Sequence, residues 1–269
     1  MSDYLLDHEP AIRLIFSVTV FILVASGEVL FPRRGQPIGR RVRWPNNLGL
    51  VVLDTALVRL LLPTAAVGLA VIAGARGWGL LNMVVLPAWL ALPLAVLVLD
   101  LAIYLQHRLF HAIPALWRLH RMHHADLEFD VTTGLRFHPV EIALSMGIKF
   151  LVIAALGPSA LAVLIFEVLL NATSLFNHGN LHMPEGIDRV LRRIVVTPDM
   201  HRVHHSVLRI ETNSNFGFNL PWWDHLLGTY RAQPRDGHEG MTIGIERFRT
   251  PRDLRLDRML IQPLLEPEN

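Results

Sequence analysis

Histidine is the residue type in this chain most suited to chemistry. The sequence holds 14 histidines, and 11 of them lie between positions 107 and 205. Four short motifs alternate in the order HxxxH, HxxHH, HxxxH, HxxHH and contain His107, His111, His120, His123, His124, His178, His182, His201, His204 and His205. On a helix, residues i and i+4 share a face, so the two histidines of each HxxxH motif can bind one metal ion. Adjacent histidines in HxxHH point about 100° apart and can reach two ions.

Ten imidazoles at repeated spacing predict a centre for two metal ions, with about five ligands each and an open position on each ion. Neutral imidazole suits iron, zinc, copper and nickel. The absence of cysteine excludes thiolate zinc sites and protein-ligated iron–sulfur clusters. Few acidic residues lie near the motifs, which argues against calcium or magnesium. The choice between iron and zinc stays open on these grounds.

Several polar residues near the motifs are candidates for orienting the ligands. Asp100 and Glu167 each precede an HxxxH motif on one face of an expected helix, as carboxylates that support a metal-binding histidine would. A hydrogen bond between helices is the equal alternative for Glu167. His138 stands alone in RFHPVE, with Glu141 three residues later. We interpret His138 either as such a supporting or substrate-facing residue or as a helix-start residue.

The composition indicates how these motifs are positioned. The chain is 52% hydrophobic and 18% charged, with a mean hydropathy of +0.37, which excludes disorder and makes a soluble domain unfavourable. Apolar stretches cover residues 11–31, 48–73, 80–105, 140–156 and 159–176. These lengths predict an all-α integral membrane bundle of about four to five membrane helices. The last pair, near 140–176, either spans the bilayer or re-enters it.

Charge placement predicts the orientation of this bundle. Arg33, Arg34, Arg40, Arg41 and Arg43 follow the first apolar stretch, so this segment should face the cytoplasm. The ten residues before that stretch carry no basic residue, so we expect a retained anchor rather than a cleaved signal peptide. Because the hairpin near 140–176 returns to the side it left, both groups of histidine motifs should meet in a cytoplasmic helical cap.

These patterns divide the chain into three parts. Residues 1–106 are expected to form N-terminal transmembrane helices, 107–230 a histidine-box catalytic region with its membrane hairpin, and 231–269 a cytoplasmic tail. The tail alternates arginines with leucines, which fits an interfacial helix or a solvated cap helix packed on the core. The predominance of arginine over lysine hints at a bacterial source, hence an inner-membrane location. Scattered arginines and a net charge of +2 exclude nucleic-acid binding.

One further charge pair lies inside the second apolar stretch. Asp54 and Arg59 are five residues apart, and charged residues are costly in a membrane. We interpret them as a structural ion pair within the bundle, with a functional role as the alternative.

The ordered motifs, together with HPxE at 138–141 and NSNFGFNLPWWDHLLGTY at 213–230, resemble the fatty acid hydroxylase/sterol desaturase superfamily over roughly residues 99–230. The resemblance implies a non-haem di-iron centre on the ten histidines named above, with O2 as co-substrate and a lipid substrate. It also implies that Asp224, in the post-ligand segment, packs under the metals, with a purely folding role as the alternative. No cytochrome b5-like domain is recognised in the sequence, so we expect a separate electron donor of ferredoxin or cytochrome b5 type.

We therefore predict an oxidoreductase that hydroxylates an unactivated C–H bond of a lipid. Desaturation on the same centre remains open. A zinc-dependent membrane hydrolase is disfavoured because no HExxH-type carboxylate lies within a ligand motif. A metal transporter is disfavoured because its ligands should lie near the bilayer midplane. A bis-histidine haem protein is disfavoured because it would need fewer paired histidines than the ten in these motifs.

Overall fold

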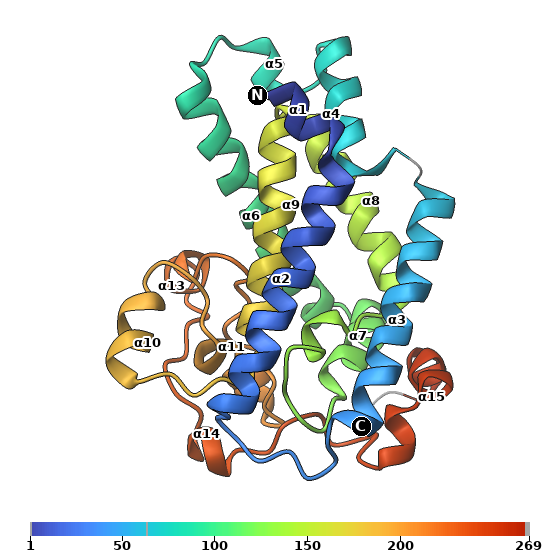
Figure 1. The fold of residues 1–269 in the computed structure, drawn as a ribbon, viewed down its shortest axis with the longest axis vertical. Helices are drawn as coiled ribbons and strands as arrows, with labels where there is room; N and C mark the ends of the chain where they lie inside the picture. The colour runs from blue at the N-terminus through green and yellow to red at the C-terminus, as the bar shows by residue number, and fades with distance from the viewer. Residues whose placement is uncertain (1, 63, 267–269) are drawn as a thin grey trace.

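The computed structural model describes residues 2–62 and 64–266, and all the regular secondary structure within these ranges is helical. Two isolated backbone bridges are recorded among the described residues, and no strand is. The long helices run side by side, while the shorter ones gather at one end of this bundle (Figure 1). The predicted all-α membrane bundle is confirmed.

Five segments are long and apolar enough to cross a membrane. They are α2 (Glu9–Leu30), the stretch Arg40–Met83, α6 (Ala88–Ala112), α8 (Pro139–Leu156) and α9 (Ala160–Asn177). Large apolar side chains of α2, including Leu14, Ile15 and Leu23, are exposed, as a lipid-facing helix requires.

The second apolar stretch is not one helix, contrary to the expectation for residues 48–73. Instead α3 (Arg40–Leu61) ends before the Pro63 of the sequence, and α4 (Ala65–Arg76) and α5 (Leu80–Met83) follow. Helices usually end at or before the residue preceding a proline. The expected span at 80–105 likewise begins only at Ala88, with α5 separate from α6.

The hairpin of α8 and α9 lies at the centre of the bundle and supports the histidine site. Each helix has 18 residues, or about 27 Å of length, and both run alongside the other long helices (Figure 1). Ile153 and Phe166 of this hairpin pack with Ala70, Leu99 and Ile103 in the main apolar core. Both helices are long and apolar enough to cross a membrane.

The end of the bundle opposite α1 (Ser2–Asp7) carries the cap, which consists of short helices and connecting segments (Figure 1). The cap helices are α7 (Pro114–His124), α10 (Glu185–Leu191), α11 (Pro198–His204), α12 (Arg209–Thr212), α13 (Trp222–Leu226), α14 (Gly237–Gly240) and α15 (Leu256–Ile261), with 3-10 turns η1 (Thr133–Leu135), η2 (Pro251–Leu254) and η3 (Gln262–Leu264). In the tail, Met259 of α15 packs on Leu50 and Met122. The tail therefore packs on the core, the second of the two alternatives.

Candidate metal centre

Nine of the ten predicted histidines converge at the junction of bundle and cap. Two groups form, and the side-chain nitrogens within each group lie within 4.8 Å of one another. The first group holds His107, His111, His120, His124 and His204, and the second holds His123, His178, His201 and His205. All nine are buried except His111, which is partly buried.

Within both groups the Nε2 atoms face one another. His107 Nε2 lies 3.1 Å from His120 Nε2 and 3.0 Å from His204 Nε2 in the first group. In the second group His178 Nε2 is 3.2 Å from the Nε2 atoms of both His123 and His201. Such a concentration of lone-pair nitrogens is what two imidazole-bound metal ions require.

The opposite ring nitrogen of several histidines is fixed by a backbone carbonyl. The Nδ1 atoms of His107, His204, His178 and His123 lie 2.8, 2.7, 2.7 and 3.2 Å from the carbonyl oxygens of Phe216, Ser214, Ser174 and Arg136. A carbonyl can only accept, so each Nδ1 must carry the proton and donate it. That tautomer leaves Nε2 unprotonated and free to bind a metal.

Two other histidines provide a direct test of whether a metal fits. Both ring nitrogens of His124 and both of His205 are buried and have no hydrogen-bond partner among the described residues. Burial, reinforced by the neighbouring imidazoles, holds the pKa of each ring well below its ordinary value. Buried, neutral and unpartnered imidazoles are costly in an apolar interior, and a bound metal would satisfy them.

The two HxxHH motifs divide between the groups as their helical spacing predicts. In α7, His120 and His124 join the first group and His123 joins the second. In the motif of α11 the assignment is the opposite: His204 joins the first group, while His201 and His205 join the second. The pair at 107 and 111, at the end of α6, enters one group, as expected of residues on one helix face.

His182 is the exception, because the structure does not bring it to the other nine. Helix α9 ends at Asn177, His178 is its C-cap, and Gly179 follows. The backbone N–H of His182 instead donates to the carbonyl of Phe31, and its side chain is exposed. The HxxxH spacing therefore does not lie on a helix here, and a glycine next to the C-cap is the sequence signal that indicates this.

Among the predicted supporting carboxylates, only Glu141 contacts a ligand candidate directly. Its Oε1 lies 2.6 Å from His120 Nδ1. Asp100 does not support a histidine, because its Oδ2 accepts the Trp223 indole N–H at 2.8 Å. Glu167 does not either, because it pairs with Lys149 and, at 3.0 Å, with Arg13. In both cases the histidine motif begins more than one helical turn after the carboxylate, so the carboxylate and the histidines are too far apart to touch.

His138 and Asp224 accept hydrogen bonds from backbone N–H groups. His138 is the N-cap of α8, where its Nδ1 accepts the Val140 N–H at 3.2 Å, which selects the helix-start alternative. Asp224 accepts the backbone N–H groups of Phe216 and Gly217 at 2.8 and 2.9 Å. Because the Phe216 carbonyl fixes His107, Asp224 supports the centre through that segment.

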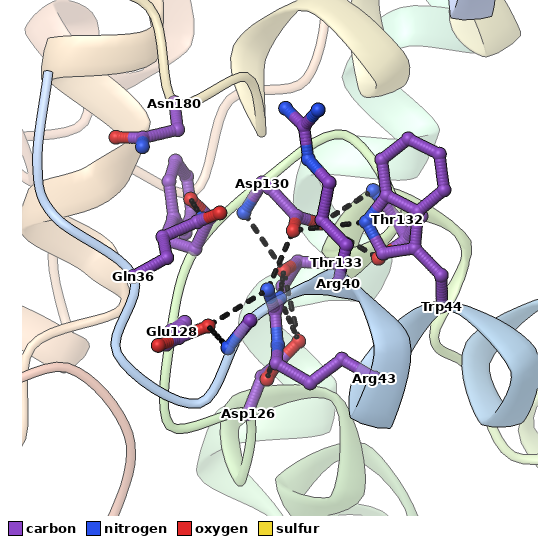
Figure 2. A network of polar contacts seen from close by, with 12 residues as sticks. Gln36, Arg40, Arg43, Trp44, Asp126, Glu128, Asp130, Thr132, Thr133 and Asn180 are labelled. Atoms are coloured by element: carbon purple, nitrogen blue, oxygen red, sulfur yellow. Dashed lines mark hydrogen bonds and ion pairs between the residues drawn. The ribbon is translucent and has the colours of Figure 1, made fainter. Parts of the chain in front are cut away.

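A buried charge network holds the loop between α7 and α8 against α3 (Figure 2). The Arg43 guanidinium donates to both Asp126 oxygens at 2.7 Å and to Asp130 at 2.5 Å. Burial favours protonation of Asp126, but Arg43 outweighs it and lowers the Asp126 pKa to about 2. Trp44 donates to Asp130 at 3.1 Å. This loop carries the Arg136 carbonyl that fixes His123, so the network positions a ligand candidate.

Aromatic rings pack against the histidines of the centre. Phe137 stacks on His123 with ring centroids 4.5 Å apart, and Phe129 lies 5.0 Å from His205. Neither ring was singled out from the sequence, nor were the carbonyls that fix the imidazoles. Single aromatic residues and backbone atoms leave no periodic pattern in a sequence, so their place beside the histidines is visible only in the folded structure.

Comparison with known proteins identifies relatives that oxidise lipids. The chain is 33% identical over 142 residues to the ornithine lipid hydroxylase OlsE of Rhizobium tropici, which covers 53% of this chain and 42% of that protein. It is 28% identical over 159 residues to the alkylglycerol monooxygenase of Homo sapiens, covering 57% and 34%. Methylsterol monooxygenase 2-2 of Arabidopsis thaliana is 25% identical over 229 residues, covering 81% and 84%. The chain thus spans less than half of the first two relatives.

No solved structure matches the chain. The sequence profile of the fatty acid hydroxylase family matches residues 92–229, which include all ten histidines of the four motifs. The match covers 138 of 269 residues and contains both histidine groups. The chain belongs to the fatty acid hydroxylase family.

Proposed function

We propose that this protein is a membrane-bound non-haem di-iron oxygenase that hydroxylates an unactivated C–H bond of a lipid. The observation that carries the proposal is the pair of histidine groups with converging Nε2 atoms, five imidazoles in one and four in the other. Monooxygenases that act on lipids are among its relatives. Two bound iron ions would supply activation of O2, which imidazoles alone do not perform.

The residues of the chain would bind and orient. The first group would hold one ion and the second the other, with the carbonyl-fixed Nδ1 atoms keeping each Nε2 aimed inward. Glu141 would fix the ring of His120, as carboxylates behind metal-binding histidines do. Phe129 and Phe137 would keep water from the centre. His182 is not part of the proposed ligand set.

The setting of the reaction is proposed on the same basis. The arginine-rich segment after α2 contacts the cap, because Arg33 pairs with Asp199 at 3.4 Å and Arg34 donates to the carbonyl of Met241 at 2.8 Å. By the positive-inside rule this supports a cytoplasmic cap in a bacterial inner membrane. A separate ferredoxin-type or cytochrome b5-type protein with its reductase would supply electrons from that side.

Incorporation of labelled oxygen tests the proposal. Membranes containing the protein, supplied with a reductant and ¹⁸O2, should yield lipids 18 mass units heavier than the parent lipid, with the same number of double bonds. Lipids that lose two hydrogens without gaining oxygen would assign desaturation instead. A His204→Ala variant should give neither product. Lipid turnover that proceeds without O2 on a zinc-loaded protein would refute an oxygenase.

A further inference from the structure

A cavity of about 280 Å³ lies beside the first histidine group. It is lined mainly by α3, α6, α8 and α9, and His107 and His120 form part of its wall. Ile103, Ile142 and Met146 give it an apolar lining. This volume is at the lower end for a ligand pocket, so it suits the reacting portion of a lipid rather than the whole molecule.

Unpartnered hydrogen-bond acceptors are the unusual feature of this cavity. Asp54 Oδ1 on α3 and Glu141 Oε2 on α8 are buried in its wall, and neither has a hydrogen-bond partner among the described residues. Gln106 Oε1 on α6 is likewise buried in the cavity wall without a hydrogen-bond partner among the described residues. A buried acceptor without a donor is energetically unfavourable, because it has lost its hydrogen bonds to water and gained none in their place. All three need N–H or O–H groups that the surrounding protein does not provide.

The nearby cations do not serve these acceptors. The predicted ion pair between Asp54 and Arg59 is not formed: Asp54 Oδ1 has no partner among the described residues, and Arg59 is exposed, since five residues correspond to about 140° around a helix. The cavity's own cations, Lys149 and Arg13, are paired with Glu167. The Glu141 carboxylate is near enough to Asp54 to act on it electrostatically.

The acceptors lie close to the reacting end of the cavity. Glu141 contacts His120 through its other oxygen, at 2.6 Å from Nδ1. One imidazole ring away, His120 Nε2 is 3.1 Å from His107 Nε2. A polar group held by Asp54 and Glu141 would therefore place its neighbouring carbons beside the histidine group, and a remote methylene would be out of reach.

We propose that Asp54 is a specificity-determining residue that binds, together with Glu141, a hydrogen-bond-donating head group of the lipid, a hydroxyl or an amine. The oxidised carbon then lies within a few bonds of that group. This inference rests on the proposed function and deepens it by naming the substrate class. Asp54 lies outside the 92–229 segment that matches the family profile.

Binding of matched probes tests the assignment. The metal-loaded protein in detergent is titrated with 1-dodecanol, dodecylamine and dodecyl methyl ether, which share one chain but differ in donors. We expect the alcohol, the amine or both to bind about tenfold more tightly than the ether, because the ether leaves the acceptors unpartnered. The two donor probes separate a hydroxyl from an ammonium head group. Equal affinity for all three probes would overturn the inference.

Variants at position 54 complete the test. Asp54→Leu should reduce the preference for donor probes severalfold, leaving the part that Glu141 supplies, while Arg59→Gln on the same helix should retain it in full. Asp54→Asn, which keeps the shape and an acceptor oxygen but removes the charge, should weaken the preference for the amine more than that for the alcohol, and serves if Asp54→Leu fails to fold. Persistence of the full preference in both Asp54 variants would contradict the role of this residue.

The position of oxidation separates this inference from the proposed function. In the ¹⁸O2 experiment with a bacterial total lipid extract, fragmentation of the product should locate the new oxygen within a few bonds of a hydroxyl or amine. A new oxygen on a remote methylene would overturn the inference and leave the oxygenase intact. Absence of any labelled lipid would refute the proposed function, while the probe affinities would still decide the role of Asp54.

Discussion

At the residue scale, spacing within a short helix is reliable and spacing across a helix end is not. The histidines of α7 and α11 divide between two groups as the 3.6-residue period requires. His182 fails because α9 ends before it, and the Asp54–Arg59 pair fails because five residues place the two side chains on different faces. The candidate site was therefore predictable wherever a motif lay inside one helix.

Substitutions at the two ends of one motif should have unlike effects on metal content. His178→Ala removes one of four imidazoles of the second group, so we expect metal per chain to fall to about half. His182→Ala should leave metal content unchanged, since that side chain is exposed. Metal analysis of both purified variants checks this. Equal losses would restore His182 as a ligand.

His238 should make stability depend on pH. Burial outweighs the nearby Asp199 carboxylate and lowers the His238 pKa to about 4. An unfolded histidine titrates near 6.5, so between these values the unfolded chain binds a proton that the folded chain does not. Stability should fall as pH drops from 6.5 to about 4, by up to about 1.4 kcal/mol per pH unit for this group.

Thermal unfolding of the detergent-solubilised protein across that range measures the effect. The variant His238→Gln should show a shallower dependence on pH than the parent protein. An identical slope in the two proteins would show that His238 does not titrate on unfolding.

At the element scale, hydropathy located the bundle but not its breaks or its supports. The five apolar stretches correspond to the long helices, yet the second divides after Leu61. The supports of the histidines are mostly backbone carbonyls, such as those of Ser174 and Ser214, and the tertiary fold alone places these. The Arg43 network joins residues more than 80 positions apart, a separation at which local patterns carry no information.

Breaking that network should destabilise the cap. Arg43→Gln leaves the carboxylates of Asp126 and Asp130 buried without their guanidinium, which typically costs about 3–5 kcal/mol. Arg41→Gln, at an exposed position two residues earlier, should change stability by less than about 0.5 kcal/mol. Comparison of the two unfolding transitions checks this. Similar stability of both variants would show that the network contributes little.

At the scale of the whole molecule, the arginine-rich segment and the cap lie at one end and the α4–α5 turn lies at the other (Figure 1). The chain has no cysteine, so each introduced cysteine is a unique label. With a cytoplasmic cap, a membrane-impermeant maleimide should label Arg76→Cys in intact cells and label Arg41→Cys and Arg193→Cys only after permeabilisation. The reverse pattern would place the histidine centre outside.

The iron content of the purified protein tests the central claim most directly. If the five-imidazole and four-imidazole groups each hold an ion, protein purified without oxygen from iron-replete membranes should contain about two iron ions per chain. Removing them should abolish lipid oxidation, and adding ferrous iron should restore it. Folded protein that binds one metal ion or none per chain under these conditions would contradict the two-metal centre.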